Sequence, residues 1–168
     1  MILTTSNYII KYIDINYIKG EDWGIMYKKD TGSLLNTLNK IYKKENLNKF
    51  ISDDLSEIKK LNIGEFFCYI CEKKHITKSE LIKKADIDRT YGYQILDGRK
   101  NPSRDKILRL CLAAKLDLKE TKRALEIGGA AQLYAKEVRD SIIIFAINNK
   151  ISIIETNELL NEKEEELL

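Results

Sequence analysis

Residues that interrupt helices are scarce in this chain of 168 residues, which contains one proline and eight glycines. Helix-forming residues are plentiful instead, and this balance favours helix over sheet. The longest apolar run, Ile142–Ile147, is far shorter than the stretch of about 20 residues that crosses a membrane. The segment Met1–Ser6 has neither a basic start nor a sustained apolar stretch, so we expect no signal peptide. These absences predict a mainly all-α, cytoplasmic protein.

Cysteine and histidine are scarce too, at three residues and one residue. An odd number of cysteines is typical of a reducing compartment without a disulfide framework. Cys68 and Cys71 form a C-x-x-C pair, with His75 four residues further on. A zinc site needs four converging ligands, whereas Cys71 and Cys111 fall on apolar helix faces, which favours core packing over a metal site. A Ser/His/Asp triad and a glycine-rich phosphate loop are also missing, so we expect no cofactor and no enzymatic activity.

The net charge of +3 is unevenly distributed along the chain. Residues 73–109 contain eleven Lys and Arg against five acidic residues, whereas residues 155–168 contain six Glu against one Lys. A basic centre beside an acidic tail is typical of a segment that faces phosphate. A solvated, lysine-rich surface explains the same charges equally well.

The N-terminal extension comprises residues 1–61 and contains two patterns. Tyrosine and isoleucine alternate between Tyr8 and Tyr17, which predicts a short β-hairpin or an extended arm. From Ser33, a plausible N-cap, apolar residues recur at helical spacing, and Ser52 begins a segment that can start another helix.

Residues 62–129 read as a domain of five helices. Thr77 and Glu80 form a capping box at the second helix, and Asp117 and Glu120 form another at the fifth. The third helix runs from about Asp88 to Asp97 and stops at Gly98, and the fourth starts at Ser103 after Pro102.

Residues 130–168 form a C-terminal extension of two helices. We expect the first over about 136–148, with a buried side made of Val138, Ile142, Phe145 and Ala146. The second begins at the capping box of Ser152 and Glu155, and we expect residues 163–168 to fray.

The informative stretch is Thr77–Ser103, two short helices joined by a tight turn. They share an apolar seam formed by Leu81, Ala85, Ile87 and Ile95. The spacing, and above all the ending Gly98–Ser103, resembles the λ-repressor/Cro-like (Xre) family over about 65 residues, from Ile63 to Ile127. The resemblance implies a five-helix helix-turn-helix domain whose third helix enters the major groove of DNA.

Three positions depart from the family pattern. Asp86 stands at the turn position usually filled by glycine, where aspartate tolerates a left-handed conformation. Ile82 replaces a small residue, and Gly92 replaces a large one on the recognition helix. Because these two positions face one another in the family, we interpret them as a swap in which Ile82 fills the space that Gly92 vacates.

The resemblance also implies roles in DNA binding for ten residues. Predicted base contacts are Arg89, Thr90, Tyr93 and Gln94. Predicted phosphate contacts are Thr77, Lys78, Tyr91, Arg99, Lys100 and Asn101. Arginine can pair with guanine and glutamine with adenine, while contacts to the backbone position the protein.

The expected function is therefore that of a sequence-specific transcriptional regulator that binds double-stranded DNA. The helices of residues 130–168 either close the domain core or form a dimer contact, and we expect a homodimer because dimers read two half-sites. The alternative is a protein-interaction module, antitoxin-like or an adaptor, which keeps the fold and uses an extension or the tyrosines of the third helix to bind a protein partner.

Overall fold

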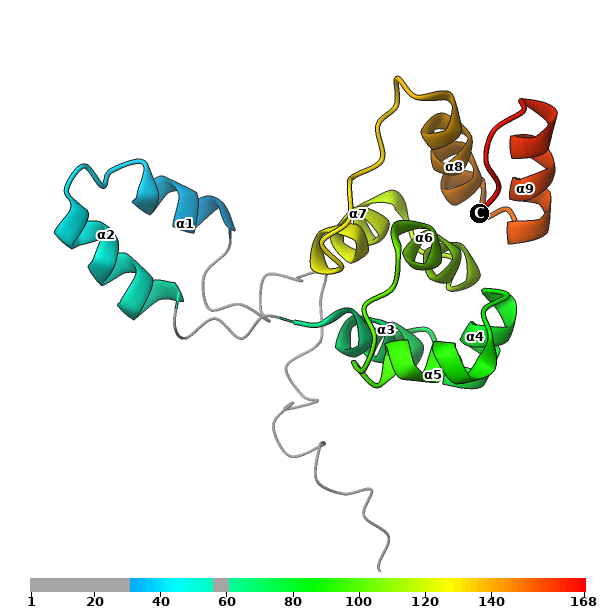
Figure 1. The fold of residues 1–168 in the computed structure, drawn as a ribbon, viewed down its shortest axis with the longest axis horizontal. Coiled ribbons are helices and arrows are strands. Elements are labelled where there is room, and N and C mark those ends of the chain that lie inside the picture. Colours follow the sequence, from blue (N-terminus) through cyan, green and yellow to red (C-terminus); the bar gives the residue numbers. More distant parts are fainter. Residues whose placement is uncertain (1–30, 56–60) are drawn as a thin grey trace, which may run out of the picture. The chain divides into compact units, whose positions relative to one another are not determined.

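The computed structural model describes residues 31–55 and 61–168 of the chain. The chain divides into two compact units, unit 1 (residues 1–59) and unit 2 (residues 60–168). All regular structure in the described residues is helical, which confirms a mainly all-α fold (Figure 1). The predicted hairpin or arm lies in residues 1–30, outside the described residues. Within the described ranges, every helix is too short or too polar to traverse a membrane.

The described part of unit 1, residues 31–55, contains three helical segments, α1 (Thr31–Leu38), α2 (Lys44–Phe50) and the π-helical η4 (Ile51–Leu55). Ser33 lies inside α1, so the prediction that it caps this helix was wrong. The prediction of a new helix at Ser52 was also wrong, because η4 follows directly from α2. The Ser52 hydroxyl donates to the carbonyl of Lys49 at 3.0 Å, a bond back to the preceding turn rather than a cap on a following one.

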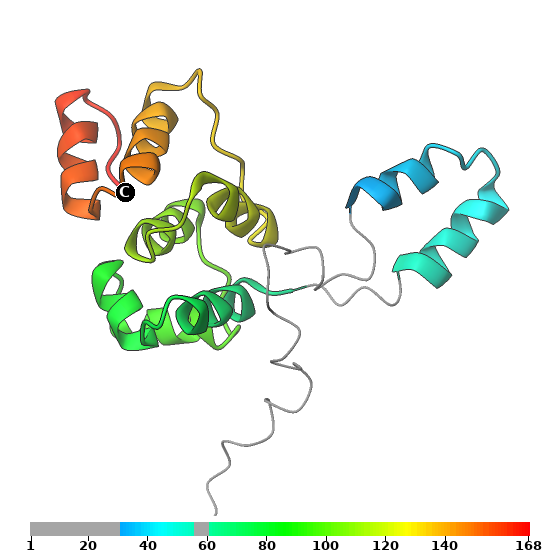
Figure 2. The same cartoon turned by 180° about the vertical axis from the view of Figure 1, so that it is seen from behind.

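Unit 2 contains all seven helices predicted beyond residue 62 (Figures 1 and 2). They are α3 (Ile63–Lys73), α4 (Lys78–Lys84), α5 (Arg89–Leu96), α6 (Arg104–Ala113), α7 (Leu118–Ile127), α8 (Val138–Asn149) and α9 (Ile153–Glu162). The three predicted capping boxes are present at the starts of α4, α7 and α9. A fourth, between Asn62 and Glu65 at α3, was missed.

The core of unit 2 joins the central helices to α8. Phe66 and Phe67 of α3 are fully buried and meet edge to face, with ring centroids 5.2 Å apart. The largest fully buried side chains in the other helices and loops include Leu81, Ile95, Ile107, Leu108, Leu125, Ile143 and Ile147. The helices of the predicted C-terminal extension therefore belong to the same compact unit as α3–α7 and cover its core.

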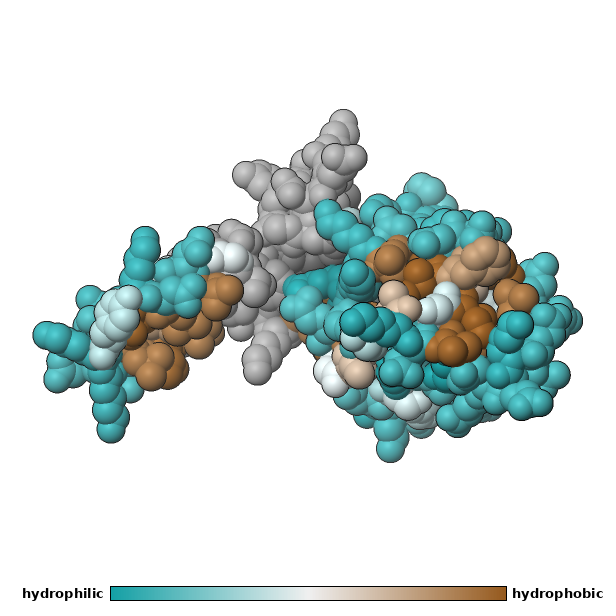
Figure 3. Space-filling view, turned by 90° about the horizontal axis from the view of Figure 1, so that it is seen from above, coloured by the Kyte–Doolittle hydropathy of each residue, from teal (hydrophilic) through white to brown (hydrophobic). Residues whose placement is uncertain are grey.

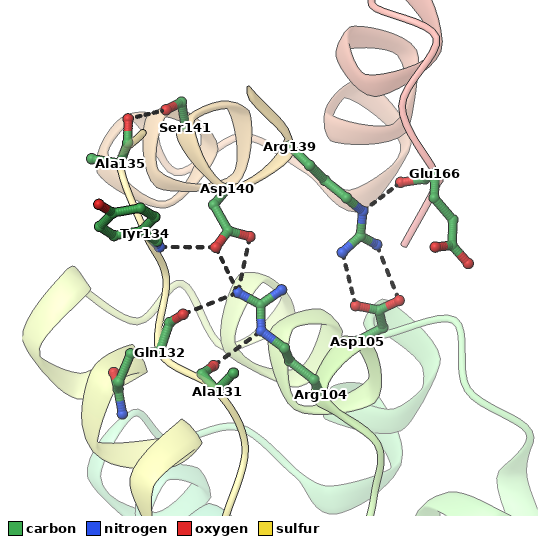
Figure 4. A network of polar contacts seen from close by, with 10 residues as sticks. All are labelled: Arg104, Asp105, Ala131, Gln132, Tyr134, Ala135, Arg139, Asp140, Ser141 and Glu166. Carbon is green, nitrogen blue, oxygen red and sulfur yellow. Dashed lines mark hydrogen bonds and ion pairs between the residues drawn. The ribbon is translucent and has the colours of Figure 1, made fainter. Parts of the chain in front are cut away.

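Two ion pairs fasten α8 to the start of α6 (Figure 4). Arg104 donates to both carboxylate oxygens of Asp140, at 2.8 and 2.9 Å. Arg139 donates to both carboxylate oxygens of Asp105, at 3.0 and 3.1 Å. Asp140 also accepts a hydrogen bond from the backbone N–H of Tyr134. The first buried residue of α8 is therefore a polar one whose hydrogen-bonding groups are satisfied.

The predicted buried side of α8 was therefore mostly wrong. Ala146 is buried as expected, but Val138 and Phe145 are more than half exposed, at 54% and 52%. The helix instead buries Asp140, Ile143, Ala146 and Ile147. Because the Arg104–Asp140 pair turns Asp140 inward, the residues three and seven positions later become the core face.

The end of the chain is held in place, which contradicts the predicted fraying of residues 163–168. Arg139 donates to the backbone carbonyls of Glu166 and Leu167, at 2.7 and 3.2 Å. The N–H of Leu168 donates to the side chain of Asn157 at 2.9 Å. The carbonyl of Leu168 accepts from Arg109 at 3.0 Å. Two arginine side chains and one asparagine side chain satisfy these backbone groups, and helix propensity does not predict such contacts.

Candidate nucleic-acid interface

The turn between α4 and α5 is packed as predicted. All four seam residues are buried, namely Leu81, Ala85, Ile87 and Ile95. Asp86 has a φ of 49°, so it adopts the left-handed conformation that the sequence suggested for this turn. The side chain of Asp88 then accepts from the N–H of Tyr91 at 2.9 Å and caps α5. Sequence-local bonds and the seam together fix how α5 leaves the turn.

Ile82 and Gly92 are in direct contact across α4 and α5. A Cβ atom added to Gly92 would lie 2.7 Å from two carbon atoms of the Ile82 side chain. Such a distance is far below van der Waals contact, so Ile82 occupies the space that a larger residue at position 92 would need. This geometry bears out the prediction that Ile82 fills the space beside Gly92.

Arg109 of α6 is a site-forming residue that the sequence reasoning missed. Its guanidinium is buried and donates to the carbonyls of Ala85 and Asp86, at 2.8 and 2.7 Å. It also forms an ion pair with the side chain of Asp86. The signal in the sequence was a single arginine between Leu108 and Leu110 on an otherwise apolar stretch. Arg109 therefore holds the turn that aims α5.

The side of α5 away from the core carries the predicted base-contacting residues. Arg89 and Thr90 are exposed, and Tyr93 and Gln94 are half-buried. The opposite side, formed by Gly92, Ile95 and Leu96, is buried. Positions 89 and 93, and positions 90 and 94, are one helical turn apart, so the four residues share one face. The structure therefore brings them together on one accessible surface.

Asp97 links two of the predicted phosphate contacts. Its Oδ2 accepts from Arg99 Nη2 at 2.8 Å, and its Oδ1 lies 3.6 Å from Lys78 Nζ. Lys78 lies at the start of α4, whereas Asp97 and Arg99 follow the end of α5. The fold thus gathers both cations and one carboxylate beside the end of α5.

Among the remaining predicted phosphate contacts, some side chains are accessible and others are engaged in hydrogen bonds within the protein. Lys100 is exposed and Tyr91 is half-buried. The hydroxyl and the N–H of Thr77 both donate to Glu80, at 2.9 and 2.8 Å, so they are engaged within the capping box. Asn101 donates to the carbonyl of Gly128 at 3.5 Å, which joins the loop after α5 to the end of α7. Lys83 and Lys84, in the last turn of α4, add exposed cations that the prediction did not include.

The three cysteines are free thiols. Cys71 and Cys111 are buried in the core, as predicted. Burial raises the pKa of Cys71 to about 11 and the pKa of Cys111 further, so both remain protonated near neutral pH. Cys68 is half-buried, and its thiol donates to the carbonyl of Leu96 at 3.4 Å. Core packing accounts for Cys71, and the bond to Leu96 accounts for Cys68.

Neither a protein-family model, a curated protein nor a solved structure matches the chain.

Proposed function

We propose that this chain is a cytoplasmic, non-enzymatic transcriptional regulator that binds double-stranded DNA with α5 in the major groove. The observation that carries the proposal is that α5 has one buried side and one accessible side. Its inner side packs on Ile82 and the seam, and its outer side presents Arg89, Thr90, Tyr93 and Gln94. A short helix that packs on the domain with one side and carries side chains able to contact bases on the other is typical of groove recognition.

The charges around α5 support the same function. Lys78, Lys83 and Lys84 lie on α4, and Arg99 and Lys100 follow α5. Cations around a base-reading face can bind the phosphates that border a groove. The resemblance to λ-repressor/Cro-like domains rests on the same elements. The free thiols fit a reducing cytoplasm.

The test is selection of bound duplexes from fragmented genomic DNA, followed by gel shifts at two salt concentrations. We expect selective binding that weakens as salt rises. Arg89→Ala and Gln94→Ala should each weaken binding to the selected site by about 1–3 kcal/mol and leave random duplexes little affected. Lys100→Ala should weaken all duplexes alike and reduce the salt slope. Equal binding of every duplex by the wild-type protein would contradict the base-reading roles.

The alternative function is a protein-interaction module built on the same helices, favoured by the two half-buried tyrosines, Tyr91 and Tyr93. It predicts no salt-dependent binding of any duplex and a stoichiometric protein partner whose binding is lost in Tyr93→Ala. The gel-shift series therefore separates the two functions.

We also propose that two copies associate through α8. Val138, Ile142 and Phe145 recur at spacings of four and three residues, the seam of a helix pair, and Val138 and Phe145 are 54% and 52% exposed. No residue from Ser141 to Asn149 is charged, and Figure 3 shows apolar residues gathered on one face of unit 2. An uncharged seam does not repel its own copy, so it can form a two-fold interface.

A further inference from the structure

Asp97 is an acidic residue in a place where helix electrostatics favour a cation. It caps the C-terminal end of α5, where the helix dipole presents partial negative charge. No basic residue lies in the last turn of α5 to offset it. The compensating charges come instead from Arg99 in the following loop and Lys78 on α4. The carboxylate is therefore retained by two cations that belong to the proposed DNA-binding surface.

Lys78 and Arg99 bind the Asp97 carboxylate in the way that two cations bind a phosphate group. The 2.8 Å bond from Arg99 to Asp97 is a charge-assisted hydrogen bond of the length that guanidinium groups make with phosphate oxygens. Lys78 approaches the other oxygen as a point charge at 3.6 Å. The side chains of Asp97 and Lys78 are each 41% exposed and that of Arg99 is 65% exposed, so an external anion can reach all three.

We propose that Lys78 and Arg99 form a single subsite for a DNA backbone phosphate, and that the Asp97 carboxylate occupies this subsite in the free protein. This inference rests on the proposed DNA-binding function. A phosphate must displace the carboxylate from both cations before it binds. Because every duplex presents the same phosphates, Asp97 lowers affinity for all sequences equally. Weak sequence-independent binding leaves more of the protein free to bind a specific site. At that site the additional base contacts offset the free-energy cost of displacing the carboxylate.

The probe is a random-sequence duplex, which reports phosphate binding without knowledge of the operator. Fluorescence anisotropy would measure its affinity for the full chain and for Asp97→Asn over a series of salt concentrations. We expect Asp97→Asn to bind about three- to tenfold more tightly, since two exposed ion pairs no longer compete. We also expect the slope of log affinity against log salt to steepen by about one.

Asp88→Asn is the matched control. It removes the same charge from the other end of α5, and asparagine preserves the cap on Tyr91. Its affinity should change less than that of Asp97→Asn. In the double variant Lys78→Ala with Arg99→Ala, adding Asp97→Asn should give no further gain in affinity.

The outcomes separate the two proposals. If the wild-type protein binds the duplex and Asp97→Asn gains no more than Asp88→Asn, the subsite is overturned and the proposed function stands. If Asp97→Asn tightens binding as much in the double variant Lys78→Ala with Arg99→Ala as in the wild-type protein, the subsite is overturned as well, because the effect is then a general change in charge. If neither the wild-type protein nor Asp97→Asn binds at the lowest salt concentration, both proposals fail.

Discussion

Arg104 and Asp140 pair in the opposite sense to their immediate neighbours Asp105 and Arg139. An Arg-Asp dipeptide at the start of α6 thus binds an Arg-Asp dipeptide at the start of α8, with each arginine donating to the other helix (Figure 4). Reversing either dipeptide would place like charges together. The pairing therefore specifies how α8 sits on α6, and with it which residues of α8 are buried.

Asp140→Ala should destabilise unit 2 by about 2–4 kcal/mol, because it leaves the mostly buried Arg104 and the N–H of Tyr134 without their partner. Urea denaturation monitored by circular dichroism would measure the change. Glu126→Ala is the control, since it removes an exposed pair with Arg123 that should contribute about 0.5 kcal/mol or less. Equal effects of the two substitutions would show that the pair does not fasten α8.

Gly92→Ala should destabilise the domain, although alanine normally favours a helix over glycine by about 1 kcal/mol. The added methyl group overlaps Ile82, and we expect a net loss of about 1–3 kcal/mol. Gly92→Ile should prevent folding. Adding Ile82→Ala to Gly92→Ala should restore part of the loss, which a double-mutant cycle in urea would measure. A Gly92→Ile variant as stable as the wild-type protein would refute the swap.

Arg109→Met should loosen the turn between α4 and α5, since it removes the donors to the carbonyls of Ala85 and Asp86. We expect a loss of about 2–4 kcal/mol. The backbone N–H of Ile87 donates to the carbonyl of Ile82 across this turn, so its hydrogen exchange should become faster when the turn loosens.

Asp86→Gly is the control for Arg109→Met. It removes the Asp86 carboxylate, but the buried Arg109 keeps its bonds to the carbonyls of Ala85, Asp86 and Leu168, and glycine accepts the positive φ, so the loss should stay below about 1 kcal/mol. A large loss in Asp86→Gly would assign the effect to the ion pair rather than to the carbonyls.

Acid should weaken the capping boxes. Bonds from the backbone and hydroxyl of Thr77 lower the pKa of Glu80, and bonds from the hydroxyl and backbone of Ser152 lower the pKa of Glu155. A carboxyl whose pKa is lower in the folded chain stabilises it fully above the ordinary pKa of 4.5, and this contribution is lost as the pH falls through the lowered pKa. In Glu80→Gln with Glu155→Gln, the melting temperature should therefore fall less between pH 5 and 3, which calorimetry would measure. Identical pH profiles would contradict this assignment.

Phe145→Glu should convert dimers to monomers, because it places a charge in the proposed seam between two copies of α8. Sedimentation over a range of protein concentrations would report the change in mass. Asn161→Glu adds the same charge to an exposed position of α9 and should leave the mass unchanged. A wild-type chain that is monomeric at every concentration would contradict the α8 interface.

The helices of unit 2 were predictable because their signals are local. Capping boxes such as that of Thr77 and Glu80 satisfy backbone groups within four residues of each other, so the sequence reveals them directly. The contact between Ile82 and Gly92 was also predictable, but only by comparing this chain with a family pattern. The buried face of α8 was not, since its pattern offered two apolar sides and the choice depends on Arg104, far away in the sequence.

The sequence by itself determined where the helices of unit 2 lie, because capping boxes and apolar periodicities act between near neighbours. The left-handed turn at Asp86 and the outer face of α5 were indicated by the family pattern that the sequence resembles. Only the tertiary structure decided that Arg109 holds this turn, that α8 turns Asp140 inward, and that Asp97 joins Lys78 to Arg99. These three features depend on charged side chains that meet across different helices, and their energies depend on burial and distance, which no local pattern encodes.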